Sequence, residues 1–303
     1  MEYRNLGPSG LKVSNLGFGC MTFGDLNQED LFCDMVKLCL SSGINFFDNA
    51  EFYSDGIAET ILGKILKRLK VPREEVVIST KIYFKSYHLD TKTHPNSKGL
   101  SRKRIIEGLK LSLERLQLEY VDVVFCSRPD SETPLEETVR TMNWVIEKGW
   151  ALYWGTSEWP AETIKEVYGL CDKLGLIKPI VEQVQYNMVV RERFEGEYGD
   201  LFDNYKMGST IWAPLAGGLL TGKYVEEIPK DSRVGKIPMA KGFSYDPHMG
   251  TEEKRVKFNE KILKLKDLAK SLDCSISQLA LAWTLKNKDV TVCMIGASNV
   301  NLS

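Results

Sequence analysis

Residues 102–126 read RKRIIEGLKLSLERLQLEYVDVVFC, and this stretch contains the unit from which the fold can be predicted. Its first part, 102–116, repeats apolar side chains three or four positions apart, which indicates a helix with one buried face: Ile105, Ile106, Leu109, Leu113 and Leu116. Its last part, 121–126, is a short apolar run of the kind found in strands that are covered on both faces. The stretch therefore predicts a helix followed by a buried strand.

The same alternation runs through the whole chain of 303 residues, a length that suits one large barrel or two ordinary domains. Strands are predicted at 13–19, 45–48, 76–81, 121–126, 151–157, 180–185, 209–215 and 290–297. Helices are predicted at 30–40, 102–116, 134–148, 161–174, 255–272 and 277–286, the last with Ser275 or Ser277 as its cap. Eight strands alternating with helices predict an α/β fold, a (β/α)8 TIM barrel that forms a single domain over 1–303.

An open, doubly wound sheet is the alternative architecture. It would usually carry a glycine-rich phosphate-binding turn after its first strand, whereas here that strand runs into GFGCMTFGD (17–25), which is not GxGxxG followed by a helix. The barrel is therefore favoured. The preceding segment YRNLGPSGLKVSNLG (3–17) predicts an N-terminal β-hairpin around a Gly-Pro-Ser-Gly turn, and this hairpin could close one mouth of the barrel.

Two long connections, 82–99 and 221–252, follow strands of the predicted barrel. Long connections in compact domains are usually functional. In a (β/α)8 barrel the active site forms where the strands end, and both connections leave from that face. We therefore expect them to act as lids over a site at the carboxyl ends of the strands.

Composition excludes several classes of function. The net charge is −1, from 40 Lys and Arg against 41 Asp and Glu, and the pI is about 6.4, which argues against a broad nucleic-acid-binding face. No apolar run approaches the roughly 18 residues of a membrane span, and the polar start MEYRNLGPSG has no secretory signal. The seven cysteines lack a CxxC pair, so we expect reduced thiols in the cytoplasm and no metal site.

Three ionisable side chains follow predicted strands in an informative order. Asp48 ends the second strand in NFFDNA, Tyr53 comes five residues later, and Lys81 ends the third strand in VVISTK. Taken singly, these residues could be a helix cap, a core tyrosine and a surface lysine. Together they suit proton donation, because an ammonium group lowers the phenol's pKa from its ordinary value near ~10. Such a phenol can protonate a carbonyl oxygen whose carbon receives a hydride from a bound cofactor.

Long segments of the chain resemble the aldo-keto reductases, and within them the β subunits of voltage-gated potassium channels and their plant relatives. The resemblance covers roughly residues 2–299. The matching segments include LGPSGLKVSNLGFG (6–19), GINFFDNAEFYSDGIAE (43–59), VVISTKI (76–82), RPDSETPLEETVR (128–140), YWGTSEW (153–159), WAPLAGGLLTGKY (212–224) and IGASN (295–299). The resemblance implies the barrel fold and a reductase site.

The family uses an Asp–Tyr–Lys–His tetrad, and the resemblance assigns its first three positions here. It implies Tyr53 as general acid, Lys81 as the partner that lowers the phenol's pKa, and Asp48 as the anchor of Lys81. The fourth position falls on Ser127 in VVFCSRPD, where many family reductases have His and channel β subunits have Asn. Because losing one preorganised donor typically costs about 10²–10³ in rate, we expect slow turnover. The alternative is that Ser127 merely fills a binding site.

The resemblance also implies NADPH, with Trp212 against the nicotinamide, Ser157 and Gln183 at its carboxamide, and Glu158 beside them. The remaining implied contacts are Asp48 and Ser127 at the reacting end, Cys20 and Met21 beside the cofactor, Ala213, Pro214, Leu215, Ala216 and Gly217 at the pyrophosphate, Lys223 and Arg233 at the phosphate and adenine end, and Gly296 and Ser298 near the 2′-phosphate. A basic pocket with hydroxyl groups favours NADPH over NADH.

Two functions follow as expectations from the resemblance. The first is slow, NADPH-dependent reduction of aldehydes or ketones. The second is an accessory subunit of a voltage-gated potassium channel that uses bound NADP(H) as a redox sensor, assembles as a homotetramer and stands at the cytoplasmic side of a membrane. A third alternative is a non-enzymatic chain that does not bind nucleotide.

Three features depart from the family pattern. Cys20 and Met21 stand where the family usually has a small residue and Trp. The connection 82–99 is longer than the family's, and Phe84 stands where Trp is frequent. The chain ends NVNLS (299–303), where the family continues with a final helix. We expect that helix to be lacking here, which would expose apolar side chains on the eighth strand and weaken cofactor binding.

Overall fold

The computed structural model describes residues 1–86, 94–230, 232–236 and 241–297. Eight parallel strands close into a barrel in the order β10-β3-β4-β5-β6-β7-β8-β9. Their bounds are β3 (Leu16–Gly19), β4 (Phe46–Asp48), β5 (Val77–Ile82), β6 (Val121–Cys126), β7 (Ala151–Ser157), β8 (Val181–Gln185), β9 (Gly208–Trp212) and β10 (Val292–Ile295). The predicted barrel is confirmed, and the open sheet is excluded.

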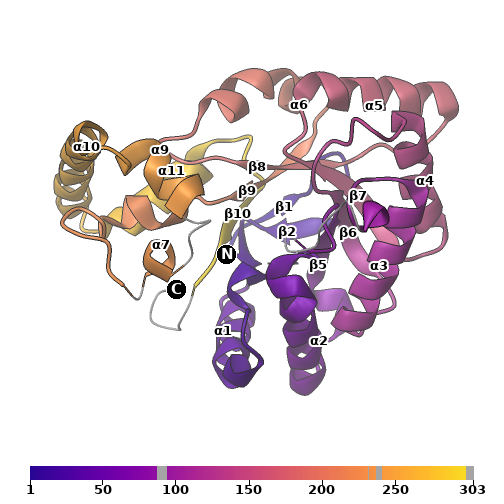
Figure 1. Cartoon of the computed structure of the whole chain (residues 1–303), viewed down its shortest axis with the longest axis horizontal. Helices are drawn as coiled ribbons and strands as arrows, with labels where there is room; N and C mark the ends of the chain where they lie inside the picture. The colour runs from indigo at the N-terminus through magenta and orange to yellow at the C-terminus, as the bar shows by residue number, and fades with distance from the viewer. Residues whose placement is uncertain (87–93, 231, 237–240, 298–303) are drawn as a thin grey trace.

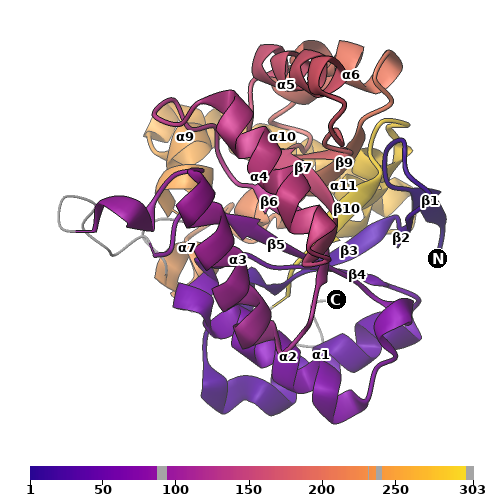
Figure 2. The ribbon, with the colours of Figure 1, turned by 90° about the vertical axis from the view of Figure 1, so that its right-hand side faces the viewer.

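Helices lie around most of this barrel (Figures 1 and 2), and none of the described residues after β10 form a helix. They are α1 (Glu29–Ser41), α2 (Ile57–Leu69), α3 (Arg102–Leu116), α4 (Leu135–Glu147), α5 (Ala161–Leu174), α6 (Gly199–Asp203), α10 (Glu252–Ser271) and α11 (Ile276–Lys286). In Figure 2, α1 and α2 lie below the barrel while α5 and α6 lie above it. The sequence analysis did not predict α2, although its apolar side chains recur at helical spacing: Ile61, Leu62, Ile65 and Leu66 are all buried.

Capping side chains explain where several elements begin. The Ser275 hydroxyl accepts from the Gln278 amide, and Gln278 Oε1 accepts from the Ser275 amide. This capping box starts α11, so of the two predicted caps, Ser275 and Ser277, the structure has Ser275. The Thr251 side chain caps α10, which therefore begins three residues before the predicted bound. The connection 221–252, predicted as a long loop, contains the short helices α7 (Arg233–Lys236) and α9 (Asp246–Met249).

Strands β1 (Tyr3–Asn5) and β2 (Lys12–Ser14) form the predicted antiparallel hairpin. Leu6 and Val13 of this hairpin are fully buried and belong to the apolar cluster inside the barrel. Gly7, with φ +57°, lies so close to the barrel rim that a Cβ there would stand 2.0 Å from the carbonyl oxygen of Ile180. The hairpin therefore closes the amino-terminal mouth of the barrel, as predicted, and needs glycine to do so.

Inward-facing side chains divide the barrel into two halves. Those near the strand starts are apolar and pack with the hairpin: Phe46, Val77, Val123, Val181 and Val292. Those nearer the strand ends are mostly polar, as described below, although the apolar Phe125 is level with Lys81. Since alternate residues of a strand face opposite sides, the residues between them point outward and pack under the helices. The amino-terminal half is therefore a filled apolar core, and the carboxyl-terminal half carries the chemistry.

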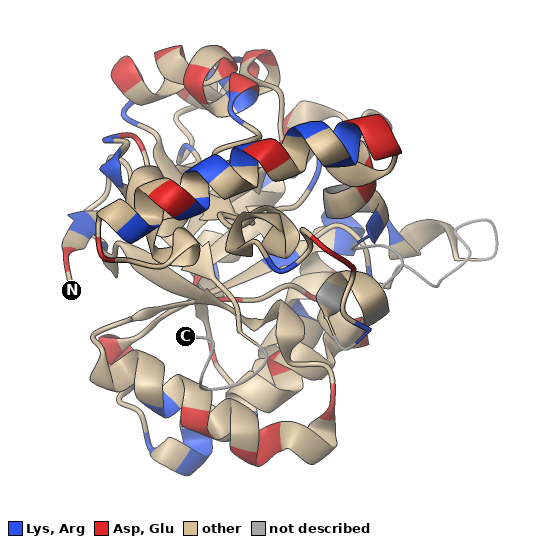
Figure 3. Ribbon diagram, turned by 90° about the vertical axis from the view of Figure 1, so that its left-hand side faces the viewer, with Lys and Arg blue, Asp and Glu red and all other residues tan. Residues whose placement is uncertain are grey.

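The outer surface shows two further features. Helix α10 carries acidic and basic side chains along its length (Figure 3), as expected for a solvated helix. Within the described residues, no helix combines the length and apolar character needed to cross a membrane. Of the outward-facing residues of the eighth strand, Cys293 is fully buried and Ile295 is partly exposed, so the expected exposure does not extend over the whole described strand.

Buried ion pairs connect the barrel to the helix layer near the strand ends. Glu51, which follows β4, pairs with Arg104 of α3, and both side chains are at most 4% exposed. Glu51 also accepts from the Tyr83 amide at 2.8 Å. Burial raises the pKa of Glu51 to about 7, and Arg104 opposes that rise. The pair thus holds the segment after β4 against the end of β5.

We predict that Arg104→Met destabilises the protein by about 3–5 kcal/mol near pH 8, because it leaves the Glu51 carboxylate buried without its partner. Without Arg104 the pKa of Glu51 rises further, so the folded variant retains a proton that the unfolded chain releases. Its stability therefore continues to fall above pH 7, where that of the wild type levels off. Chemical denaturation should show a smaller loss at about pH 5.5 than at about pH 8.5.

Arg140→Met is the matched control, since Arg140 and Glu136 form an ion pair whose side chains are each 51% exposed. This variant should change stability by less than about 1 kcal/mol, with no trend across the same pH range. An equal loss in both variants, or a loss in Arg104→Met that is independent of pH, would contradict the role given to the buried pair.

Candidate active site

The polar half of the barrel contains the side chains that the sequence analysis selected at the strand ends. Asp48 lies two residues after the inward-facing Phe46, and Lys81 lies four after Val77, so both face inward by the alternation of a strand. Ser157, at the end of β7, is paired in register with Gln183, the middle residue of β8. All four are 3% exposed or less. The structure therefore brings these predicted residues to one end of one barrel.

Asp48, Lys81 and Tyr53 form a connected group. The Lys81 ammonium donates to Asp48 Oδ2 at 2.5 Å, to the Asn49 carbonyl at 2.6 Å and to the Tyr53 hydroxyl at 3.3 Å. The same nitrogen lies 5.0 Å from the centre of the Tyr53 ring. The Lys81 ammonium group therefore contacts both the Asp48 carboxylate and the Tyr53 hydroxyl oxygen.

Two neighbours of Asp48 complete its hydrogen bonds. Its Oδ1 accepts from the Ser79 hydroxyl at 2.7 Å and from Gln183 Nε2 at 3.1 Å. Sequence reasoning selected Gln183 but missed Ser79 and the Asn49 carbonyl. Ser79 could have been found, because it precedes Lys81 by two residues and therefore shares its face of β5. The backbone carbonyl carries no sequence signal.

Burial and charge act in opposite directions on Lys81. Burial lowers the pKa of its ammonium group, and the negative charge of Asp48 opposes this effect. An ammonium group 3.3 Å from the phenol favours the phenolate. The arrangement can therefore stabilise Tyr53 after it gives up a proton, which is the property required of a general acid.

Tyr53 is carried by a strained turn. The two residues after it, Ser54 and Asp55, have φ of 49° and 54°, and Gly56 follows with φ 90°. Consecutive left-handed residues are costly and persist where the surroundings impose them. The Tyr53 ring packs edge-on against Phe52 at 4.9 Å, and Phe52 in turn packs against Phe84 at 6.4 Å. Phe84 is thus connected to the candidate acid through Phe52, while residues 87–93 of its connection lie outside the described residues.

Ser127 follows β6 and is 3% exposed. Its amide donates to the Ile82 carbonyl at 3.1 Å, which places it next to the end of β5. The Arg128 guanidinium donates to the Ser127 carbonyl at 2.7 Å. Ser127 therefore occupies the strand-end position expected for the fourth member of the group.

The segment after β9, residues 213–218, contains several left-handed residues and is called the cradle segment below. Ala213, Ala216, Gly217 and Gly218 all have φ between 50° and 101°. Left-handed residues in a turn direct amide groups toward one concave side, which suits a phosphate. Asn187 Nδ2 donates to the Ala213 carbonyl at 3.0 Å, and a Cβ at Gly218 would stand 3.0 Å from the Lys223 side chain. Two amides of the segment are already in use, because those of Ala216 and Gly218 donate to the carbonyls of Ala213 and Leu215, each at 2.9 Å.

The other residues predicted to bind the cofactor lie in several parts of the chain. Pro214 and Leu215 lie in the cradle segment, and Gly296 is exposed at the end of β10. Cys20 is wholly buried, whereas Met21 is 41% exposed. Of these two residues, only Met21 is therefore accessible to a cofactor. The backbone of Arg233 lies in α7, and Ser298 lies outside the described residues.

Trp212 and Glu158 lie together. Trp212 is the last residue of β9 and faces inward, and its indole nitrogen donates to Glu158 Oε1 at 2.8 Å. The carboxylate also accepts from the Gln185 amide at 2.9 Å and pairs with Arg193. Sequence reasoning missed Arg193, because no local pattern connects it to the end of β7.

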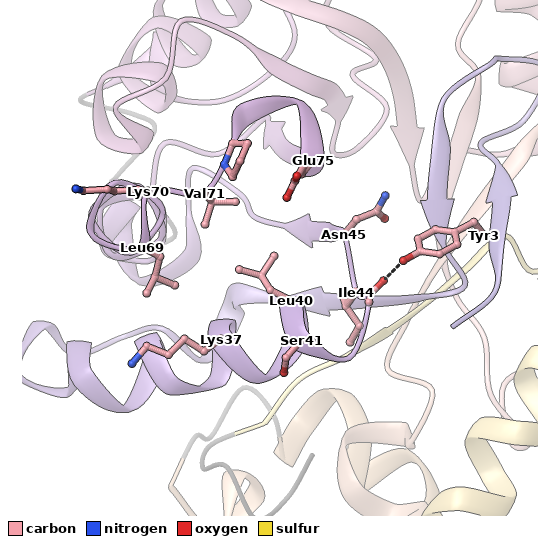
Figure 4. Close-up of a pocket in the computed structure, with 12 residues that line it drawn as sticks. Tyr3, Lys37, Leu40, Ser41, Ile44, Asn45, Leu69, Lys70, Val71 and Glu75 are labelled. Atoms are coloured by element: carbon pink, nitrogen blue, oxygen red, sulfur yellow. Dashed lines mark hydrogen bonds between the residues drawn. The ribbon is translucent and has the colours of Figure 1, made fainter.

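A separate groove lies away from these residues. Figure 4 shows it between the ends of α1 and α2, with Lys37, Leu69 and Glu75 among its lining residues. The Tyr3 hydroxyl donates to the Gly43 carbonyl at 2.8 Å at its edge. Its lining residues precede β4 and β5, so the groove belongs to the amino-terminal face. Among the described residues, no three His, Cys, Asp or Glu side chains gather as metal ligands.

Comparison with known proteins agrees with this arrangement. The model of the Aldo/keto reductase family matches residues 15–302. A protein of Arabidopsis thaliana named "Probable voltage-gated potassium channel subunit beta" is 46% identical over 302 residues, which is 98% of this chain and 88% of that protein. A protein of the same name from Oryza sativa subsp. japonica is 44% identical over 99% of this chain and 88% of its own length. The chain therefore belongs to the aldo/keto reductase family.

Proposed function

We propose that this protein is an NADPH-dependent oxidoreductase that reduces aldehydes or ketones by hydride transfer. The observation that carries the proposal is the buried contact of Lys81 with Asp48 and with the Tyr53 hydroxyl. Membership of the aldo/keto reductase family supports an oxidoreductase, and the proposal adds the cofactor, the substrate class and the roles of the residues.

Each member of the group has a distinct task in this proposal. Tyr53 donates its proton to the carbonyl oxygen as that oxygen gains negative charge. Lys81 stabilises the resulting phenolate by its charge. Asp48 keeps the ammonium group charged and in place, which matters because burial by itself lowers the pKa of Lys81. The closed, apolar lower half of the barrel excludes water from beneath the group.

NADPH would supply the hydride. Ser157 and Gln183 offer a hydroxyl and an amide to the carboxamide, and the Trp212 indole offers a flat face to the nicotinamide. The left-handed segment 213–218 would hold the pyrophosphate with the Lys223 side chain above Gly218 and with amides other than those of Ala216 and Gly218, which already donate to backbone carbonyls. We extend the proposal to Lys223, Arg233, Gly296 and Ser298 as contacts of the phosphate and adenine end.

We also propose that turnover is slow, because of Ser127. A serine hydroxyl is short, offers one donor and cannot become cationic. At the position where many family members have His, it would stabilise the developing oxyanion less strongly.

A second candidate function is supported by the relatives. Both proteins named above are described as probable β subunits of voltage-gated potassium channels. We propose as the alternative that this chain, as a cytoplasmic homotetramer, binds the intracellular domain of such a channel and reports redox state through bound NADP(H). The two functions are compatible, because the site faces the carboxyl ends of the strands and leaves the outer helices free to dock.

We predict that the purified protein forms a complex with the cytoplasmic domain of at least one voltage-gated potassium channel of its source organism. Size-exclusion chromatography with light scattering measures both the complex and the expected tetramer. Tyr53→Phe should bind the channel domain as the wild type does, since docking is assigned to the outer helices and Tyr53 lies at the carboxyl end of the barrel. If no channel domain of that organism binds, the second candidate is rejected while the reductase proposal stands.

We predict that Tyr53→Phe slows reduction of 4-nitrobenzaldehyde by about 10²-fold or more, because the proton donor is removed. Single-turnover oxidation of bound NADPH, followed by its absorbance, measures this rate. NADPH affinity should remain within about twofold, because the phenol oxygen is assigned to the substrate and not to the cofactor.

Tyr3→Phe is the matched control, since its hydroxyl bonds to the Gly43 carbonyl at the opposite end of the barrel. This variant should reduce the aldehyde at the wild-type rate. If the wild type does not oxidise NADPH, or if Tyr53→Phe oxidises it equally fast, the enzymatic proposal is wrong.

We predict that Ser127→His speeds the same reaction by about tenfold or more, because it restores a strong donor at the oxyanion. Ser127→Ala separates the two interpretations of the serine. A slower rate in Ser127→Ala assigns a donor role to the hydroxyl, whereas an unchanged rate means that serine only fills the space. An unchanged or slower rate in Ser127→His contradicts the explanation of slow turnover.

A further inference from the structure

Glu158 adopts an unusual backbone conformation directly after β7. Its φ is 61°, in the left-handed region that residues other than glycine seldom adopt. The turn brings its carboxylate to the ends of the next two strands, where Oε1 accepts from the Gln185 amide at 2.9 Å and from the Trp212 indole nitrogen at 2.8 Å. One carboxylate thus connects the ends of β7, β8 and β9. A strained residue held by such contacts marks a position that the surrounding structure determines.

Arg193 holds the other side of this carboxylate. It begins η6 (Arg193–Glu197), a single π-helical turn, and its Nη1 donates to Glu158 Oε2. Its Nη2 donates to the Trp159 carbonyl at 2.9 Å. Turns of this kind are rare and occur frequently at functional sites. The arginine therefore fixes both the carboxylate and the backbone beside it.

The guanidinium group is itself restrained. Arg193 Nε donates to Glu197 Oε2 at 3.1 Å, and Glu197 Oε1 accepts from the Ala161 amide at the start of α5 at 2.7 Å. The guanidinium also stacks on the Tyr198 ring at 5.1 Å. A continuous series of contacts therefore runs from the start of α5 through Arg193 and Glu158 to the Trp212 indole.

Glu158 is poorly suited to contact a dinucleotide. Its Oε1 already accepts two hydrogen bonds, its Oε2 is paired with the Arg193 guanidinium, and a carboxylate repels the phosphates of NADP(H). Trp212, in contrast, is a partly exposed side chain with two rotatable torsions, and one charged hydrogen bond at its indole nitrogen fixes the plane of its ring.

We infer that Glu158, held by Arg193, is a positioning residue that sets the plane of the Trp212 indole for the nicotinamide, and does not itself contact the cofactor. This inference rests on the proposed function, because it takes from it that NADPH is the ligand. It replaces the cofactor contact that the sequence analysis expected of Glu158.

The first test observes the indole without any cofactor. The chain contains six Trp residues, so protein with ¹⁵N-labelled tryptophan gives few indole signals, and Trp212→Phe identifies the one that belongs to Trp212. Glu158→Gln should move that signal upfield and Glu158→Ala should move it further, because the charged acceptor is first neutralised and then removed. Arg191→Met is the matched control: Arg191 pairs with Glu195 beside the same π-helical turn, and its loss should leave the signal in place.

The second test is a double-mutant cycle on NADPH affinity, measured by cofactor fluorescence. Glu158→Ala should weaken binding about tenfold when Trp212 is present, the size of effect expected for one charge-assisted bond. In the Trp212→Phe background the same change should weaken binding by less than about twofold, because no indole nitrogen remains to be held. Glu158→Gln supplies the same comparison if the alanine variant folds poorly.

The outcomes distinguish the two proposals. Equal effects of Glu158→Ala in both backgrounds, or an indole signal that does not move, overturn the positioning role while wild-type NADPH binding leaves the proposed function intact. Stronger NADPH binding in both backgrounds would show that the carboxylate acts on the cofactor only by repulsion, which also overturns the inference. Absence of NADPH binding by the wild type rejects the proposed function itself.

Discussion

The buried ion pair between Lys81 and Asp48 is the constraint on which the site depends. Two charges removed from water each lose several kcal/mol of hydration, and their attraction compensates only when further hydrogen bonds satisfy the remaining atoms. Ser79 and Gln183 complete the carboxylate, while the Asn49 carbonyl and the Tyr53 hydroxyl complete the ammonium group. The Tyr53 phenol is thus one of the partners that offset the cost of burying the Lys81 charge. The same Lys81–Tyr53 hydrogen bond therefore serves both the stability of the fold and the proposed acid.

The barrel separates stability from chemistry along its axis. Its lower half is filled by apolar side chains and closed by the hairpin, where Gly7 contacts the rim. Its upper half holds the residues with positive φ that surround the site: Ser54 and Asp55 after Tyr53, Glu158 after β7, and Ala213 and Ala216 after β9. Strained turns can persist there because the packed lower half holds the strands whose ends they extend.

The sequence contains much of this arrangement, but not all of it. The strand ends at Asp48 and Lys81 could be predicted, because short apolar runs show where strands lie and a parallel barrel brings their ends together. Helix α2 was missed despite its regular spacing, since it follows the irregular turn after Tyr53. The contact between Glu158 and Trp212 could not be predicted, because it depends on a φ of 61° and a π-helical turn that no residue pattern specifies.

The charged pairs near the carboxyl ends of the strands have two features in common. Asp48–Lys81, Glu51–Arg104 and Glu158–Arg193 each join two segments that are distant in sequence, and in each the carboxylate also accepts a further protein hydrogen bond. Apolar pairs of similar size would often be at least as stable. They would not fix an ammonium group under a phenol or the plane of an indole, because apolar contacts have no preferred direction. The need for directional contacts at the strand ends therefore explains why charged pairs are found at the carboxyl-terminal rim, whereas the core beneath it is apolar.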